Sequence, residues 1–218
     1  MKEVIKNEYY ALSPNLGFLQ IKLPQLIIDE VKTNVDQIKS NFNKSTSAVN
    51  TLAGEIKHEY DTFLGPNTTN FIKEASINFL KHQPFNFLNS QRVKSDDYDP
   101  NDFSFVNNYK GKAWINFQKK YEYNPVHNHA GLLSYVIWYQ VPYLMKNEDE
   151  HSPKQNNIFN GRFSFLHPLD GLIHNCNLDI DKTMEGTMAI FPSTLAHTVY
   201  PFYTSDDYRI TLSGNLLF

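Results

Sequence analysis

Apolar side chains in the first half of the chain recur at every third or fourth position. This spacing is typical of an amphipathic helix that packs one face on a core. Over residues 24–43 the apolar positions after Pro24 are Ile27, Val31, Val35, Ile38 and Phe42. A second helix is expected after Pro66 and the polar residues 67–69, which form a typical helix start. Its predicted buried side comprises Phe71, Ile72, Ala75, Phe79 and Leu80.

From about Trp114 the pattern changes to short runs rich in Val, Ile, Thr, Tyr and Phe, separated by Gly, Pro, Asn and Asp. Such runs are typical of antiparallel β structure. Residues 132–141 are almost continuously apolar and indicate a deeply buried strand, whereas residues 162–165 alternate and indicate a half-exposed one. We expect strands near 113–118, 132–142, 161–166, 187–191, 196–202 and 208–217. The chain is therefore predicted to be mainly β with flanking helices, an α+β arrangement.

The length of 218 residues favours a single domain. Within residues 1–218 we expect a helical or irregular N-terminal part, 1–110, and a β core, 111–218. Residues 146–155 are charged and contain Pro153. We interpret this segment as a loop, either a mobile lid or a solvated hairpin connection.

Charge and hydropathy narrow the possible partners. The net charge of −3 and the pI of about 6.2 give no basic surface of the kind expected for a dedicated nucleic-acid binder. Residues 1–8 carry charges where a signal peptide has its apolar stretch, and no later window is apolar enough to cross a bilayer. We expect a soluble cytoplasmic protein that binds neither nucleic acid nor membrane.

The chain contains a single cysteine, Cys176. One cysteine excludes intramolecular disulfides and thiolate metal clusters, so any metal must be held by nitrogen and oxygen ligands. No base is recognisable beside Cys176 in the sequence, although His174 is near. We therefore expect this cysteine to be a small, partly buried apolar residue rather than a nucleophile.

Three of the eight histidines have a spacing that favours metal binding. His127 and His129 are two residues apart, so in an extended strand both point to one face. His197 follows a buried strand that ends at Pro192, and it can return beside this pair. Three imidazoles suit Fe, Zn, Cu or Ni and leave coordination positions open for a co-substrate and oxygen. The alternative is that these histidines only pack across strands. For the remaining five we expect solvent contact, capping or turn packing: His58, His82, His151, His167 and His174.

Arg209 stands in an otherwise apolar predicted strand. A buried guanidinium needs an anionic partner because its desolvation is unfavourable. That partner could be an internal carboxylate, from Asp206, Asp207 or Asp170. Alternatively, Arg209 could bind the carboxylate of a ligand through two parallel hydrogen bonds, with the Thr211 hydroxyl on the same face adding a third.

These residues resemble the 2-oxoglutarate- and Fe(II)-dependent oxygenases related to prolyl hydroxylases, in the branch found in marine bacteria and their viruses. The resemblance runs roughly from Leu52 to the C-terminus. It is densest at residues 114–116, 122–129, 133–134, 186–197 and 209–215. It implies a double-stranded β-helix, a cupin-like jelly roll with the N-terminal helices packed on one sheet.

The resemblance also implies site residues. Family members bind iron through a His-x-Asp or His-x-Glu pair and a distal His, so His127 and His197 match and His129 stands at the carboxylate position. Arg209 and Thr211 match the residues that hold the far carboxylate of 2-oxoglutarate. Tyr139 stands where similar oxygenases often place an aromatic hydroxyl near the co-substrate, and core packing is the alternative for this residue.

The function implied by the resemblance is a dioxygenase of the hydroxylase type that uses Fe(II), 2-oxoglutarate and O2. Oxidative decarboxylation of 2-oxoglutarate to succinate and carbon dioxide would drive hydroxylation of a small molecule or a peptidyl group. Residues 84–110 and 144–160 are possible pocket walls. Two alternatives remain: a cupin-like metal enzyme that does not use 2-oxoglutarate, which an internal Arg209–aspartate pair would favour, and a non-catalytic jelly-roll interaction protein such as a viral structural component.

Overall fold

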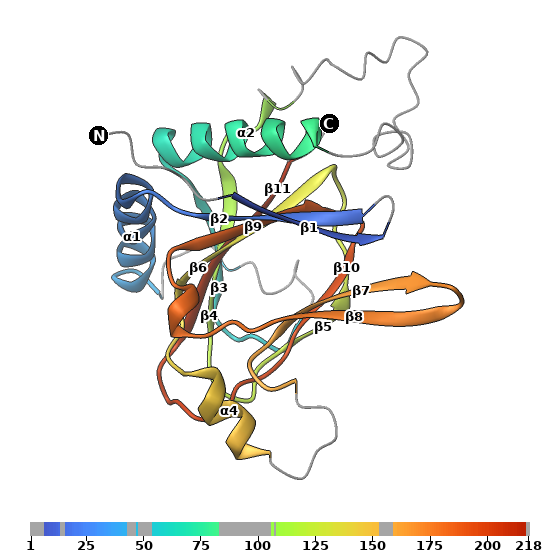
Figure 1. Cartoon of the computed structure of the whole chain (residues 1–218). Coiled ribbons are helices and arrows are strands. Elements are labelled where there is room, and N and C mark those ends of the chain that lie inside the picture. Colours follow the sequence, from blue (N-terminus) through green and yellow to red (C-terminus); the bar gives the residue numbers. More distant parts are fainter. Residues whose placement is uncertain are drawn as a thin grey trace.

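The chain forms two antiparallel sheets that face each other, with helices on the outer face of the larger one (Figure 1). The computed structural model describes residues 7–13, 16–42, 47, 54–82, 106, 108–152 and 159–216. The larger sheet has the order β1-β2-β9-β6-β11-β4-β3. In that order its strands span Asn7–Ser13, Leu16–Lys22, Thr187–Pro192, Leu133–Gln140, Arg209–Leu216, Lys112–Gln118 and Glu59–Phe63.

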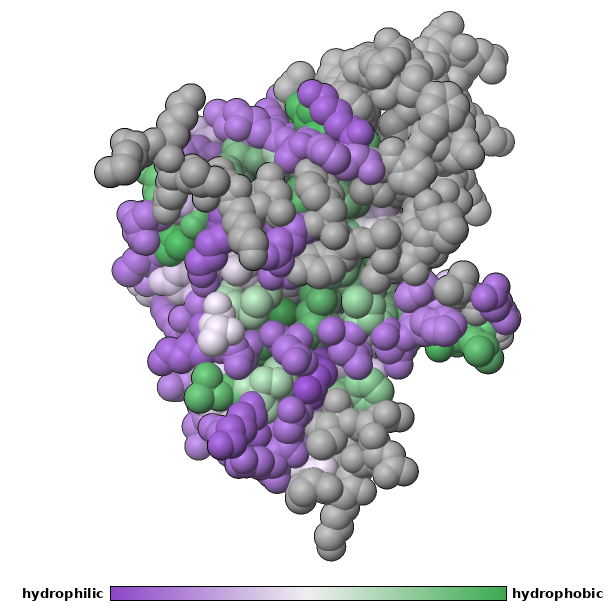
Figure 2. Space-filling model, in the orientation of Figure 1, coloured by the Kyte–Doolittle hydropathy of each residue, from purple (hydrophilic) through white to green (hydrophobic). Residues whose placement is uncertain are grey.

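The smaller sheet has the order β5-β10-β7-β8. Its strands span Asn124–His127, Ala196–Val199, Phe163–Leu169 and Leu172–Leu178. The β7–β8 hairpin projects from the body of the protein in Figure 1. Figure 2 shows a largely hydrophilic surface with hydrophobic side chains at the tip of this hairpin, where Leu172 and Ile173 are exposed.

Two helices cover the larger sheet because each has one apolar face. α1 spans Gln25–Lys39 and α2 spans Pro66–Lys81. Glu30 of α1 accepts hydrogen bonds from the backbone N–H of Thr68, at 2.6 Å, and from its hydroxyl, which supplies the N-terminal cap that α2 lacks in its own sequence. No helix in the described part of the chain is long and apolar enough to cross a bilayer.

The two faces of the larger sheet belong to different apolar cores. Ile115, Ile137 and Leu212 pack against the helices, whereas Val136 and Trp138 pack against aromatic residues of the smaller sheet. Residues two apart on a strand share a face. Strand β6 therefore contributes alternately to the helix-side core and to the space between the sheets, which explains its almost continuous apolar sequence.

The predicted arrangement of helices and strands is confirmed, with differences at several elements. The helix predicted over 24–43 spans 25–39, and the helix predicted after Pro66 is α2. All six predicted strands are present, as β4, β6, β7, β9, β10 and β11, although β10 ends at Val199. The sequence pattern did not reveal β1, β2, β3, β5 or β8. The prediction of a helical or irregular N-terminal part is therefore wrong in part, because β1, β2 and β3 belong to the larger sheet.

The segment predicted as a charged loop is partly helical. Residues Met145–His151 form α4, and residues 153–158 lie outside the described part of the chain. Glu148 is fully buried and accepts hydrogen bonds from the backbone N–H groups of Tyr203 and Thr204 at 2.9 and 2.8 Å. This buried acid connects α4 to the loop that follows β10, whereas the interpretation of residues 146–155 as a solvated loop predicted no such contact. Most of the other predicted pocket wall, residues 84–110, also lies outside the described residues.

Candidate metal centre

The smaller sheet positions two of the three histidines, and the loop after β5 positions the third. His127 ends β5, and its register partner on the neighbouring strand β10 is His197. His129 lies two residues beyond β5, where its backbone N–H donates to the Ser193 carbonyl at 2.8 Å. The tight turn after β9, closed by the hydrogen bond from Leu195 N–H to the Pro192 carbonyl, brings His197 back to this pair. The predicted convergence is present, although a loop contact rather than strand alternation places His129.

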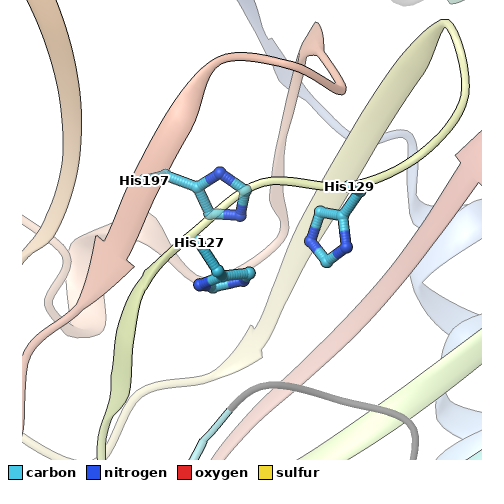
Figure 3. A group of neighbouring side chains, drawn as sticks. All are labelled: His127, His129 and His197. Carbon is cyan, nitrogen blue, oxygen red and sulfur yellow. The ribbon is translucent and has the colours of Figure 1, made fainter.

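The three imidazole rings form one cluster, in which they point toward one another (Figure 3). The ring centroid of His127 lies 4.3 Å from that of His197 and 5.0 Å from that of His129. One ligand nitrogen from each ring lies within 4.8 Å of the others. This spacing is suitable for one ion that all three rings share.

Backbone carbonyls set the orientation of two rings. His127 Nδ1 lies 2.7 Å from the Pro125 carbonyl, and His197 Nδ1 lies 2.9 Å from the Leu195 carbonyl. A carbonyl only accepts, so each Nδ1 must carry the hydrogen and each Nε2 keeps its lone pair. Metal-binding histidines are commonly held in this way by an outer hydrogen bond.

Burial keeps the rings neutral. It lowers the pKa of His127, and together with the proximity of His127 it lowers the pKa of His129 to about 4 and that of His197 to about 3. A metal binds the neutral imidazole, so none of the ligands must lose a proton at neutral pH. The apolar surroundings that desolvate His197 are aromatic: Phe163, Phe165 and Phe191 lie within 6.4 Å, measured between ring centroids.

Arg209 lies on β11 and is 2% exposed. Its Nε and Nη2 donate to Gln118 Oε1 at 3.0 and 2.6 Å, and its Nη1 donates to the Tyr143 hydroxyl at 2.6 Å. Carbonyls of Gly161 and Tyr200 accept the remaining hydrogen bonds. All these acceptors are neutral, so the guanidinium is hydrogen-bonded but its charge is not compensated by a carboxylate among the described residues.

The internal salt bridge considered for Arg209 is therefore not formed. Asp206 instead pairs with Lys120, at 2.7 Å between Nζ and Oδ1. Gly161 has a backbone φ of +69°, and a Cβ there would lie 2.8 Å from the Tyr143 ring. Only glycine combines this conformation with so close an approach. Its carbonyl can then accept from both Tyr143 and Arg209.

One cavity between the two sheets contains both the histidine cluster and Arg209. Thr211 also lines this cavity, and its hydroxyl has no hydrogen-bond partner within the described ranges. Tyr139 does not reach the cavity. It packs on the helix side of the larger sheet, near Lys32 and Asp36 of α1. The packing alternative for Tyr139 is the one that the structure supports, because Trp138 rather than Tyr139 faces the space between the sheets.

Several polar residues of the cavity were not predicted as site residues. They include Glu59, Trp114, Asn116, Gln118, Asn124, Ser134, Ser213 and Asn215. A signal was present for Asn116 and Gln118, since they alternate with the apolar Ile115 and Phe117 on one buried strand. No comparable signal marked Glu59, which lies on the unpredicted strand β3.

The other five histidines lie outside the cluster of His127, His129 and His197. His82 caps the C-terminal end of α2, with its Nδ1 at 2.8 Å from the Asn78 carbonyl. His58 stacks on Phe42, and His151 stacks on Tyr203. His167 and His174 stack on each other across the β7–β8 hairpin. Cys176 is partly buried, and burial raises the pKa of its thiol, which does not favour a nucleophile.

Residues 112–215 match the protein family described as "Putative 2OG-Fe(II) oxygenase". Through this segment, the chain is similar to that family. The matched segment begins at β4 and includes all three clustered histidines, Arg209 and Thr211. A comparison with curated proteins gives no match to this chain.

The fold of this chain is similar to that of solved structures. The structure of OsALKBH1 matches with a TM-score of 0.51 and 11% identity, covering 94% of this chain and 98% of that one. A Pseudomonas putida prolyl-4-hydroxylase matches with a TM-score of 0.49 and 12% identity, covering 91% and 90%. The predicted double-stranded β-helix, with helices on one sheet, is confirmed.

Proposed function

We propose that this protein is a 2-oxoglutarate- and Fe(II)-dependent dioxygenase of the hydroxylase type. The observation that carries the proposal is the shared cavity of a neutral three-histidine cluster and a buried guanidinium without a carboxylate partner. The first suits a divalent metal, and the second suits the far carboxylate of a dicarboxylic co-substrate.

The donor set fits a redox-active divalent ion. His127, His129 and His197 would hold Fe(II) from one side, through neutral nitrogens, and leave the remaining positions open. When bound, the metal supplies the oxygen chemistry that the side chains of this cavity cannot provide. The protein itself contributes orientation and a dry wall: Pro125 and Leu195 fix two rings, and the phenylalanines around His197 exclude water.

Arg209 and Thr211 would bind the far carboxylate of 2-oxoglutarate. The guanidinium donates hydrogen bonds to neutral acceptors on Gln118, Tyr143 and Gly161, which hold it in place and leave its charge available to an anion. One or two of these neutral acceptors would be exchanged for carboxylate oxygens, which bind a guanidinium more strongly because the hydrogen bond is then between charged groups.

The hydrogen bonds of Arg209 also bear on the two alternative functions, a metal enzyme that does not use 2-oxoglutarate and a non-catalytic jelly-roll protein. A cupin-like metal enzyme without 2-oxoglutarate would be favoured by an internal Arg209–aspartate pair, and the described residues do not form one. A purely structural jelly roll has no need to gather three neutral imidazoles around one point in the same cavity as an uncompensated buried cation, since both arrangements desolvate polar groups without mutual compensation.

Calorimetric titration tests the proposal. Wild-type protein should bind one Mn(II), and the Mn(II) form should then bind 2-oxoglutarate. H197A should lose Mn(II) binding, whereas R209M should keep Mn(II) and lose at least tenfold in 2-oxoglutarate affinity. R162M is the matched control, because Arg162 pairs with Asp149 and Asp179 outside the cavity, and it should retain both affinities.

Two results would contradict the proposal: absence of Mn(II) binding by the wild type, or 2-oxoglutarate affinity that does not depend on Arg209. Succinate release after oxygen is added to the Fe(II)-loaded protein then separates the proposed dioxygenase from a metal enzyme that does not use 2-oxoglutarate. The R162M protein should release succinate at the wild-type rate.

A further inference from the structure

Glu59 is the second ionisable side chain of the cavity that is buried without a charged partner. It lies on the edge strand β3, is 1% exposed and lines the same cavity as the histidine cluster and Arg209. Its Oε1 has no hydrogen-bond partner anywhere in the described part of the chain. A buried carboxylate without partners is destabilising, and such groups are concentrated at functional sites.

Asn116 presents a second oxygen of the same kind. It is the register partner of Glu59 on the neighbouring strand β4 and is 7% exposed. Its Oδ1 also lacks a partner within the described residues, and it lines the same cavity. Two unsatisfied acceptor oxygens therefore lie side by side on one wall.

The strand register places this pair beside the proposed co-substrate site. Asn116 pairs with Thr211 on β11, and Thr211 pairs with Trp138 on β6. Glu59, Asn116 and Thr211 thus form one row across the larger sheet. Arg209 lies two residues from Thr211 on the same face of β11, where its partner is Gln118. Within the cavity, the cationic Arg209 therefore lies in the row that contains Gln118, and the acidic Glu59 lies in the neighbouring row that contains Asn116 and Thr211.

The charge around Glu59 is complementary to a cation. Burial and the negative charge of Glu122 together raise the pKa of Glu59 to about 7. The same two effects favour the approach of a positive group, which would restore the lost solvation and reduce the repulsion between the two acids. A neutral donor would satisfy the hydrogen bonds but would not offset the charge.

We propose that Glu59 and Asn116 form a substrate-binding subsite for a cationic group with N–H donors, such as an ammonium or a guanidinium. This inference rests on the proposed function, since it names the substrate class of the same cavity. The cation donates to Glu59 Oε1 and Asn116 Oδ1, while the rest of the substrate extends toward the histidine cluster. Glu59 acts as a specificity residue and takes no part in oxygen chemistry.

A matched pair of probes tests the subsite. The full-length protein is loaded with Zn(II) and 2-oxoglutarate, which allows no turnover, and is titrated by NMR with n-butylguanidine and with n-butylurea. The probes have nearly the same shape and differ in charge. Wild-type protein should bind the guanidine at least tenfold more tightly than the urea, and E59Q should bind the two within about twofold.

The variants have internal controls. E59Q preserves the side-chain shape, and its circular dichroism spectrum reports whether the fold is retained. D61N removes an acid two residues along β3 that does not line the cavity, so it should keep the wild-type preference. Equal affinities for the two probes in the wild type, including no binding of either, would overturn the inference. A preference that survives in E59Q would overturn it as well.

Failure of the subsite and failure of the proposed function give different results. If Zn(II) and 2-oxoglutarate bind but the guanidine is not preferred, the inference is wrong and the oxygenase proposal stands. If the guanidine is preferred in a manner that depends on Glu59 while Zn(II) does not bind to the histidines, the subsite stands and the oxygenase proposal fails.

Discussion

The neutral side chain of His129 distinguishes this metal centre at the scale of single residues. Three neutral imidazoles leave the full charge of a divalent ion uncompensated by its protein ligands. The resemblance to oxygenases places a carboxylate at this position, and a carboxylate would remove one unit of that charge. The all-nitrogen set should therefore bind divalent ions more weakly than a set with one carboxylate.

Replacement of His129 by Glu tests this effect of charge. Glu has a reach similar to that of the imidazole, so H129E should bind Mn(II) about tenfold more tightly or better, because the ligand charge attracts the ion. Calorimetric titration measures the affinity. H174E, on the exposed β8 strand, is the control and should leave the affinity unchanged. An H129E protein that binds Mn(II) no better than wild type would show that His129 does not lie at the ion.

Glu59 should make stability depend on pH. Burial and Glu122 raise its folded-state pKa from 4.5 to about 7, so the folded protein holds this proton more tightly than the unfolded chain does. Stability from this group is therefore present below pH 4.5 and is lost as the pH rises through about 7. Relative to wild type, E59Q should gain about 1–3 kcal/mol of unfolding free energy between pH 4.5 and pH 8.

Urea unfolding of both proteins at the two pH values measures this difference, and the titration of the histidines cancels in the comparison. A difference that does not change with pH would mean that Glu59 is solvated or paired in the folded protein. That result would also remove the electrostatic argument for its subsite.

At the scale of elements, α4 and the loop that follows β10 support Arg209. Glu148 of α4 is buried and accepts from Tyr203 and Thr204, while the Tyr200 carbonyl in the same loop accepts from Arg209. One buried acid thus connects a short helix to the neighbourhood of the guanidinium. The segment 146–155 is too short and too charged for its sequence to reveal this role.

E148Q should destabilise the protein by about 2–4 kcal/mol, because its amide nitrogen replaces one acceptor oxygen of the buried carboxylate and leaves the backbone N–H of either Tyr203 or Thr204 without that partner. The exposed Glu150 on the same helix lies 3.8 Å from Lys146, and E150Q should change stability by less than about 0.5 kcal/mol. Urea unfolding of the two variants tests the difference. Similar values for both would indicate that Glu148 is accessible to water.

Which elements could be predicted depended on how their side chains are buried. The helices and the central strands could be found because they are buried on at least one face, so their apolar residues recur with a clear period. β8 is exposed along most of its length, and β5 is four residues long, so neither has such a period. β3 was missed with them, and Glu59 was missed because its strand was not recognised.

The histidine cluster was more predictable from the sequence than the residues around it. The spacing of His127 and His129 and the strand before His197 indicated convergence without any knowledge of the tertiary structure. The partners of Arg209 could not be predicted, because Gln118, Tyr143 and Gly161 come from three separate segments that only the fold brings together. Tyr139 packs against the helix-side core, which was the alternative for this residue, because neighbouring residues on a strand point to opposite faces.

At the scale of the whole molecule, a metal at the histidine cluster would connect β5, β10 and the loop that contains His129. The backbone N–H of His129 already joins this loop to Ser193. Binding to the folded state alone stabilises a protein by mass action. At free Zn(II) one hundred times its Kd, the wild type should gain about 2.7 kcal/mol in unfolding free energy, and chelation should reverse the gain. H197A should show no gain. A gain of equal size in H197A would mean that the ion binds elsewhere.

The central claim is that one ion binds all three imidazoles while Arg209 binds the co-substrate. A crystal structure with Zn(II) and N-oxalylglycine, an unreactive analogue of 2-oxoglutarate, tests it most directly, with anomalous scattering to locate the zinc. We expect a single zinc at about 2.0–2.1 Å from one nitrogen each of His127, His129 and His197, and the far carboxylate of the analogue on Arg209. Zinc bound away from these rings, or an analogue carboxylate that does not contact Arg209, would contradict the account.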